Sequence, residues 1–186
     1  MSKLKILAVV GSLRRDSLNL QLAKKAGELL ADEAEFEILD FSDVPFFNQD
    51  IEYPAPEAVS KVRDKVINAD GVWFFSPEYN HFFSGVLKNL LDWLSRKPEG
   101  SDVHVLFNKP AALSGITFGM SGTALSQDNL VTLLSFLNLD IMNVPRLVIP
   151  NADSQLGENG RLKLTASEKY LEKQASSFMQ FIRNRK

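Results

Sequence analysis

Near its amino terminus the chain reads Ile6-Leu7-Ala8-Val9-Val10-Gly11-Ser12-Leu13-Arg14-Arg15-Asp16-Ser17-Leu18-Asn19. The first five residues form an apolar run that predicts a buried strand, and a helical pattern follows the stretch. The loop between them is small, hydroxyl-rich and cationic. A loop of this kind, leading from a strand into a helix N-terminus, is suited to holding a phosphate group. The stretch therefore predicts an α/β fold that binds a phosphorylated ligand.

The side chains of this loop support that interpretation. Gly11 lets the backbone approach a ligand closely, while Ser12 and Ser17 supply hydroxyl donors. Asn19 adds an amide, and Arg14 adds a permanent charge with a planar set of donors. A structural alternative is that Ser17 only caps the helix and Arg14 is a solvated surface residue. Neither G-x-x-x-x-G-K-[ST] nor G-x-G-x-x-G occurs here, so a single phosphate is expected rather than a pyrophosphate.

Composition restricts the class of protein. With 186 residues, of which 45% are hydrophobic, residues 1–186 are expected to form a single domain. The net charge is −2 and no long run of Lys and Arg occurs, so no nucleic-acid partner is expected. The chain has no cysteine, which excludes a thiol nucleophile and a disulfide scaffold, so redox chemistry would need a bound cofactor. No two histidines have metal-ligand spacing, and no metal site is expected.

Targeting signals are also absent from the pattern. The first residues lead straight into a strand without a secretory leader, and no apolar run approaches the roughly 20 residues that span a bilayer. We therefore expect a soluble, cytoplasmic protein without a membrane partner.

Along the chain, short apolar strands alternate with amphipathic helices. The expected strands are 4–10, 36–39, 71–76, 111–117 and 141–149, and the helices between them are centred on 22–30, 59–69, 86–94 and 125–137. Thr165 to Glu168 reads as a capping box that opens a last helix. Strands joined through helices run parallel with right-handed crossovers, so the pattern predicts a doubly wound five-stranded parallel sheet with helices on both faces. Ligands in such sheets bind beyond the carboxyl ends of the strands.

Two further loops follow expected strands at that edge. After the third strand, Pro77 stiffens a turn and Tyr79 places an aromatic surface beside polar groups, which suits a stacked heteroaromatic ring. After the fourth strand, Gly119 and Gly122 let backbone N–H groups approach a ligand. Each loop alone is equally compatible with a purely structural turn. Together with the phosphate loop they indicate a mononucleotide that carries a large aromatic ring.

At this point the residues resemble a known family. Residues 11–19, Pro-Glu-Tyr-Asn-His at 77–81 and Ser-Gly-Val-Leu-Lys-Asn-Leu-Leu-Asp-Trp-Leu at 84–94 look like the NADPH-dependent FMN reductase family, which includes quinone, chromate and azo-dye reductases. The resemblance covers about residues 4 to 150. It implies a flavodoxin-like fold with the strand order 2-1-3-4-5. It also implies homodimers, often paired into homotetramers.

The resemblance assigns roles to single residues. Around the FMN phosphate it implies Ser12, Arg14, Ser17 and Asn19, with Leu20 beside them. Along the isoalloxazine ring it implies Pro77, Glu78, Tyr79 and Asn80, with Thr117 and Gly119 at the pyrimidine end. The chain departs from the family pattern at Thr123 and Leu125, where relatives tend to have a second glycine and an arginine.

Three other features have more than one interpretation. His81 follows the ring loop, but a structural role is favoured over proton donation. Trp93 is expected in the core or at a subunit interface. Phe46 and Phe47, adjacent in an expected loop, must either fold back on the sheet or enter a neighbouring subunit.

We therefore expect an oxidoreductase in which bound FMN takes hydride from NADPH or NADH and passes electrons to a small acceptor such as a quinone, an azo compound, free flavin or a metal oxyanion. No catalytic acid, base or nucleophile is required from the protein, because the cofactor supplies the reactivity. The main alternative is a flavodoxin-like FMN electron carrier that does not oxidise NAD(P)H. A second alternative is a regulatory domain that binds a phosphorylated signal without chemistry.

Overall fold

A computed structural model describes residues 3–185. A six-stranded parallel sheet forms its centre, with the path β2-β1-β3-β4-β5 and with β6 also paired to β4. The strands are β1 (Leu4–Val10), β2 (Ala34–Ile38), β3 (Gly71–Phe75), β4 (Pro110–Ile116), β5 (Asp140–Ile141) and β6 (Leu147–Ile149). The predicted fold class and strand order 2-1-3-4-5 are therefore confirmed.

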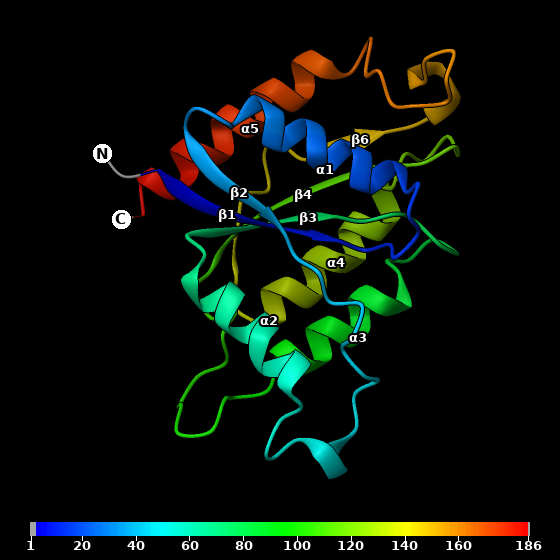
Figure 1. The fold of residues 1–186 in the computed structure, drawn as a ribbon. Helices are drawn as coiled ribbons and strands as arrows, with labels where there is room; N and C mark the ends of the chain where they lie inside the picture. Colours follow the sequence, from blue (N-terminus) through cyan, green and yellow to red (C-terminus); the bar gives the residue numbers. More distant parts are fainter. Residues whose placement is uncertain (1–2, 186) are drawn as a thin grey trace.

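Within the described residues, five α-helices connect and cover these strands. They are α1 (Leu18–Leu29), α2 (Glu57–Asn68), α3 (Gly85–Leu94), α4 (Ala124–Phe136) and α5 (Glu168–Arg183), and two short 3-10 helices lie at Gln49–Ile51 and Ala152–Gln155. Helices α1 and α5 pack on one face of the sheet, and α2, α3 and α4 pack on the other (Figure 1). No helix in residues 3–185 is long and apolar enough to cross a membrane.

The central strands are apolar because both faces are covered. All five residues of β3 are buried, as a doubly covered parallel strand requires. Trp73 of this strand donates to the Ser114 hydroxyl at 2.8 Å, and that hydroxyl donates to the side-chain amide oxygen of Gln174 at 2.6 Å. This buried polar chain joins β3, β4 and α5, and it satisfies the indole N–H inside the core.

Two expectations about local structure were wrong. The expected strand 141–149 is two short strands, because residues 142–146 leave the ladder between β5 and β6, where Pro145 has no N–H to donate. The expected capping box has Thr165 as the cap and Glu168 three residues later, but the cap of α5 is Ser167, which makes no side-chain cap hydrogen bond. Instead the Glu168 N–H bonds the Leu164 carbonyl at 2.9 Å, so the backbone itself closes the first turn.

Candidate functional site

The three predicted loops lie at one edge of the sheet. Residues 11–17 follow β1, residues 76–84 follow β3 and residues 117–123 follow β4, and all three strands are parallel neighbours. Figure 1 shows these loops together at the right-hand end of the sheet. The contacts between them show how closely they approach.

The loops after β1 and β3 are packed against each other at Gly11. Its N–H donates to the Phe75 carbonyl at 2.9 Å, and a Cβ at this position would lie 3.1 Å from both Pro77 Cδ and Ser84 Oγ. That distance is shorter than ordinary van der Waals contact. Any side chain here would push Pro77 or Ser84 away by a few tenths of an ångström, so glycine suits the close packing of the two loops.

The start of α1 is tied to the end of β4 through Asn19. Its amide nitrogen donates to the Ile116 carbonyl at 3.1 Å, and its amide oxygen accepts the Ile116 N–H at 3.1 Å. The Asn19 side chain is buried at this position. The second N–H of this amide takes no part in either bond and can donate to another acceptor. A contact between Asn19 and the FMN phosphate remains a prediction.

Glu78 joins the loop after β3 to the loop after β4. Its carboxylate accepts the Ser121 hydroxyl at 2.8 Å and the Ser126 N–H, at the start of α4, at 3.0 Å. The side chain is only 6% exposed. Burial opposes its ionisation, but the bonds from Ser126, Ser121 and His81 outweigh burial and lower the Glu78 pKa from 4.5. The carboxylate therefore holds two loops together and points toward α4.

The phosphate loop is folded on itself. The Ser12 hydroxyl accepts the Arg14 N–H at 3.4 Å, and the Ser17 hydroxyl accepts the Leu20 N–H at 3.4 Å as the cap of α1. In both bonds the hydroxyl is the acceptor, so its own hydrogen remains free to donate. Arg14 is exposed and donates to the Asp16 carbonyl at 2.6 Å with one of its five N–H groups. Capping and phosphate binding are therefore compatible here.

Tyr79 is presented by a tight hairpin. Its N–H and carbonyl pair with the carbonyl and N–H of Phe82, at 2.9 and 3.0 Å. The two residues between them, Asn80 and His81, have φ of 52° and 62°, as a type I′ turn requires. Asparagine tolerates this left-handed conformation well. The turn leaves the Tyr79 side chain 54% exposed at the rim.

The loop after β4 combines an open glycine with a strained threonine. The nearest atom to a Cβ built at Gly119, leaving out its chain neighbours, is Thr117 Cγ2 at 3.9 Å, so the protein itself does not require glycine there. Thr117 is held by its N–H, which donates to the Ile149 carbonyl at 3.1 Å. Thr123 is fully buried with φ of 102°, a conformation that costs a β-branched residue free energy. This strain occurs where the sequence departs from the family pattern.

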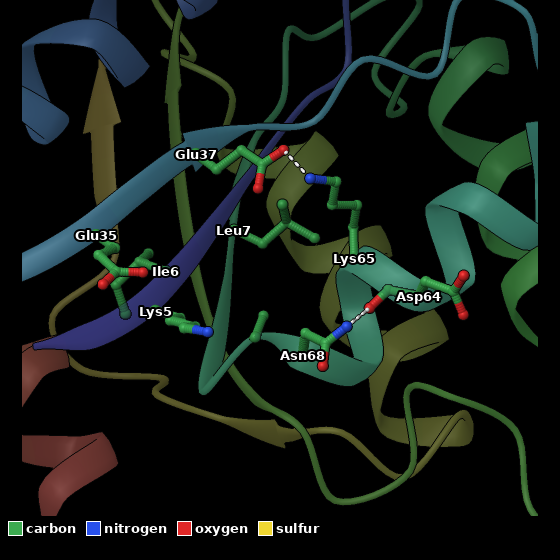
Figure 2. A pocket seen from close by; sticks show the side chains of 9 residues that line it. Lys5, Ile6, Leu7, Glu35, Glu37, Asp64, Lys65 and Asn68 are labelled. Carbon is green, nitrogen blue, oxygen red and sulfur yellow. Dashed lines mark hydrogen bonds and ion pairs between the residues drawn. The ribbon is translucent and has the colours of Figure 1, made fainter. Parts of the chain in front are cut away.

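A cavity of about 540 Å³ opens beside the phosphate loop. Of the predicted site residues, Arg14 and Leu20 line it, and the others lie outside its lining. A second cavity, of about 480 Å³, is shown in Figure 2. Its lining comes from β1, β2 and α2, including Glu37 and Lys65, which form an ion pair at 2.9 Å. That cavity contains no residue of the three loops.

The loop before α2 is anchored by Trp93, which is fully buried and donates to the Pro45 carbonyl at 2.8 Å. Phe47 packs edge-on against the Trp93 ring at a centroid distance of 4.9 Å. Phe46 instead remains 86% exposed. One aromatic of the pair folds back on the protein and the other does not.

Sequence reasoning missed the residues that hold the loops together. Ser126 donates its hydroxyl to the Pro77 carbonyl at 3.0 Å and its N–H to Glu78. The sequence pattern assigns no role to Ser121, which lies between Gly119 and Gly122. A serine two residues into a helix, facing an acidic residue one loop away, carries no sequence signal without the fold.

Comparisons with known proteins agree with this arrangement. The family model for NADPH-dependent FMN reductase matches residues 4–154. A 2-hydroxy-1,4-benzoquinone reductase from a Burkholderia species is 37% identical over 183 residues, covering 98% of each chain. An NAD(P)H-dependent FMN reductase from Pseudomonas aeruginosa is 34% identical, covering 97% of this chain and 96% of its own.

A solved structure shows the same fold at similar identity. The flavoenzyme NAD(P)H:(acceptor) oxidoreductase from Paracoccus denitrificans is 32% identical, with a TM-score of 0.86 over 97% of each chain. The family implies FMN and a nicotinamide cofactor, as the sequence predicts. With its fold, its three joined loops and these relatives, the chain belongs to the NADPH-dependent FMN reductase family.

Proposed function

We propose that residues 1–186 form one FMN-binding domain that oxidises NAD(P)H and reduces a small acceptor of the quinone class. The observation that carries this proposal is that the three loops are joined at the carboxyl edge of the sheet. The loop after β3 contacts the other two directly, and the start of α1 is bonded to the end of β4. Gly11 packs on Pro77, Asn19 bonds Ile116, and Glu78 bonds Ser121. Ligands of doubly wound sheets bind at this edge.

The phosphate end of the site rests on residues 12–20. The free hydroxyl hydrogens of Ser12 and Ser17 and the unused N–H groups of Arg14 form a donor set without an acidic side chain that bonds them. The N-terminus of α1 adds a partial positive charge. These donors fit a phosphate dianion, and Asn19 and Leu20 lie beside them on the first turn of α1.

The ring end of the site rests on the other two loops. Tyr79 offers an exposed aromatic face, with Pro77, Glu78 and Asn80 shaping its turn. Gly119 leaves its backbone open to a ligand, and Thr117 lies on the same loop. Residues in this arrangement bind and orient a flat ring and exclude water from it. Hydride transfer between a nicotinamide cofactor and a small acceptor is the chemistry that FMN supplies when bound.

The names of the relatives support a quinone as the acceptor. The Burkholderia relative is a 2-hydroxy-1,4-benzoquinone reductase, and it covers nearly the whole chain at 37% identity. Azo compounds, free flavin and metal oxyanions are further acceptors of the same exposed site. No protein side chain acts as acid, base or nucleophile in this proposal.

We further propose that the protein associates as a dimer or a tetramer. Support comes from the loop before α2, which is anchored by Trp93 and Phe47 yet leaves Phe46 86% exposed. Ile51 and Tyr53 of the same loop are 41% and 54% exposed. Large apolar side chains held in water on a rigid loop are typical of protein interfaces.

A steady-state assay with a reconstituted protein tests the proposal. Protein saturated with FMN is mixed with NADPH or NADH and a simple benzoquinone, and dinucleotide oxidation is followed by absorbance. We expect turnover that requires both FMN and protein. An electron carrier without NAD(P)H oxidation would bind FMN and turn over negligibly, and a regulatory domain would not bind FMN.

A further inference from the structure

The cavity beside the phosphate loop is strongly cationic. Its volume is about 540 Å³, and it lies between α1 and the segment that follows β6. The charged side chains in its lining are four cations and one carboxylate, namely Arg14, Arg15, Lys24, Arg161 and Asp16. The whole chain has a net charge of −2, so this concentration of positive charge is local.

These cations are not neutralised by the protein. Within residues 3–185, none of the four forms an ion pair, whereas Arg96, Arg146 and Arg183 each pair with a carboxylate at 2.7 to 2.8 Å. All four are exposed around the cavity. Cations that line a concave surface without partners raise the local concentration of an anion.

The segment that carries Arg161 is fixed against α1. Residues 156 and 162 form an antiparallel bridge, and the Leu162 N–H donates to the Gln21 amide oxygen at 2.9 Å. Within the turn, the Arg161 N–H donates to the Asn159 side chain at 3.0 Å. Arg161 on this segment and Lys24 on α1 therefore line the same cavity from two connected elements.

Besides the charged residues and the polar Gln21 and Asn159, the lining includes apolar side chains. Leu18, Leu20 and Leu156 contribute aliphatic surface, and Phe118 contributes an aromatic ring that is 55% exposed. Phe118 lies between Thr117 and Gly119, both predicted at the ring, and Arg14 belongs to the phosphate loop. The cavity thus adjoins the predicted FMN site and combines an aromatic face with cations.

We propose that this cavity binds the adenosine 2′-phosphate end of NADPH, with Lys24, Arg15 and Arg161 contacting the 2′-phosphate. The proposal rests on the proposed function, because it places the distal end of the nicotinamide cofactor. A 2′-phosphate monoester is a dianion that NADH lacks. The three cations accordingly favour NADPH over NADH, and the aromatic ring of Phe118 suits stacking with adenine.

Binding of two nucleotides to FMN-saturated protein tests the cavity without turnover. The probes are 2′,5′-ADP and 5′-AMP, which differ only in the 2′-phosphate, titrated by calorimetry in a phosphate-free buffer of low ionic strength. We expect 2′,5′-ADP to bind at least tenfold more tightly. The double variant Lys24→Gln/Arg161→Gln should lose most of that preference. The double variant Lys169→Gln/Lys173→Gln, which removes the same two charges on α5 outside the lining, should keep it.

A kinetic measurement separates this proposal from the proposed function. In the double variant, KM for NADPH should rise about tenfold or more while KM for NADH changes less than twofold. Equal binding of the two nucleotides, or an unchanged preference in the double variant, would overturn the cavity assignment while turnover with either dinucleotide continued. Absence of turnover with both dinucleotides would instead contradict the proposed function.

Discussion

The side-chain amide of Asn19 pairs with both backbone groups of Ile116, with two hydrogen bonds of 3.1 Å across 97 residues of sequence. Asn19 lies in the first turn of α1, and Ile116 is the last residue of β4. Through these two bonds, a side chain of α1 pairs with the backbone of β4 at its last residue. They set the distance between the loop after β1 and the loop after β4.

Asn19→Ala should therefore destabilise the protein. The substitution leaves the buried Ile116 N–H and carbonyl without these partners, which costs about 2–4 kcal/mol in the free energy of unfolding. Urea unfolding measures this loss. Asn68→Ala is the matched control, because Asn68 bonds only the exposed Asp64 carbonyl of its own helix, and it should cost less than about 0.5 kcal/mol. Equal losses in the two variants would show that the Ile116 pairing carries no special weight.

Arg14→Ala should weaken FMN binding. Loss of a charge-assisted hydrogen bond costs about 1.5–3 kcal/mol, which corresponds to roughly tenfold to over a hundredfold in the dissociation constant. Quenching of FMN fluorescence on binding measures that constant. Arg183→Ala, which removes an exposed ion pair with Glu33, should leave it unchanged. If Arg14→Ala bound FMN as tightly as the unmodified protein, Arg14 would not belong to the site.

Glu78→Gln should loosen the loops around the predicted ring. The amide would place a donor where the carboxylate accepts from Ser121 and Ser126, at a cost of about 1–3 kcal/mol at pH 7. Because the folded-state pKa of Glu78 lies below 4.5, its stabilisation is complete above about that pH and is lost as the pH falls through the folded-state value.

Thermal or urea unfolding at pH 7 and pH 3 tests this dependence. The difference between Glu78→Gln and the unmodified protein should be large at pH 7 and smaller at pH 3. Glu57→Gln removes an exposed helical ion pair with Lys61 and should cost at most about 0.5 kcal/mol at pH 7. A Glu78→Gln penalty that did not shrink at low pH would rule out the carboxylate as its source.

Thr123→Gly should stabilise the protein by about 1 kcal/mol. Release of a β-branched residue from φ of 102° returns about 1–3 kcal/mol, and part of this is lost to the greater freedom of glycine in the unfolded chain. The Gln127 amide, which now donates to Thr123, keeps its bond to the Leu147 carbonyl at 2.7 Å. Thr123→Ala retains a Cβ at the same φ and should show no gain. A less stable Thr123→Gly would mean that the packing of Thr123 outweighs its strain.

Phe46→Ser should weaken self-association without unfolding the protein, because this side chain is 86% exposed. Phe47→Ala should instead lower the stability of the fold, because its ring packs on Trp93 and the loss of this packing costs about 2 kcal/mol in the free energy of unfolding. Sedimentation velocity at several concentrations measures association, and urea unfolding measures stability. A Phe46→Ser protein of unchanged mass would place the interface elsewhere.

Much of the fold was predictable because burial dictates local pattern. The run from Leu4 to Val10 and the apolar strand 71–75 are covered on both faces, so their sequences carry a continuous signal. The region from Ile141 to Ile149 was predicted as one strand because its ends are apolar. The interruption at 142–146 depends on where the backbone can pair with β4, which no local pattern encodes.

The site was predictable in its location more than in its contacts. Ser17 and Tyr79 lie where a strand–loop–helix pattern places them, at one edge of the sheet. Glu78 was predicted beside the ring, yet its carboxylate bonds Ser121 and Ser126 over 40 residues away. Such a bond depends on two loops meeting in space. The same holds for the cationic cavity, whose Arg161 and Lys24 come from distant segments.

The central claim is that residues 12–20 hold the phosphate of FMN at the edge where the three loops meet. Titration with FMN and with riboflavin, which lacks only the phosphate, tests it most directly. We expect FMN to bind at least about a hundredfold more tightly, since several charge-assisted hydrogen bonds depend on the phosphate. Equal affinity for the two flavins, or no binding of either, would contradict the account.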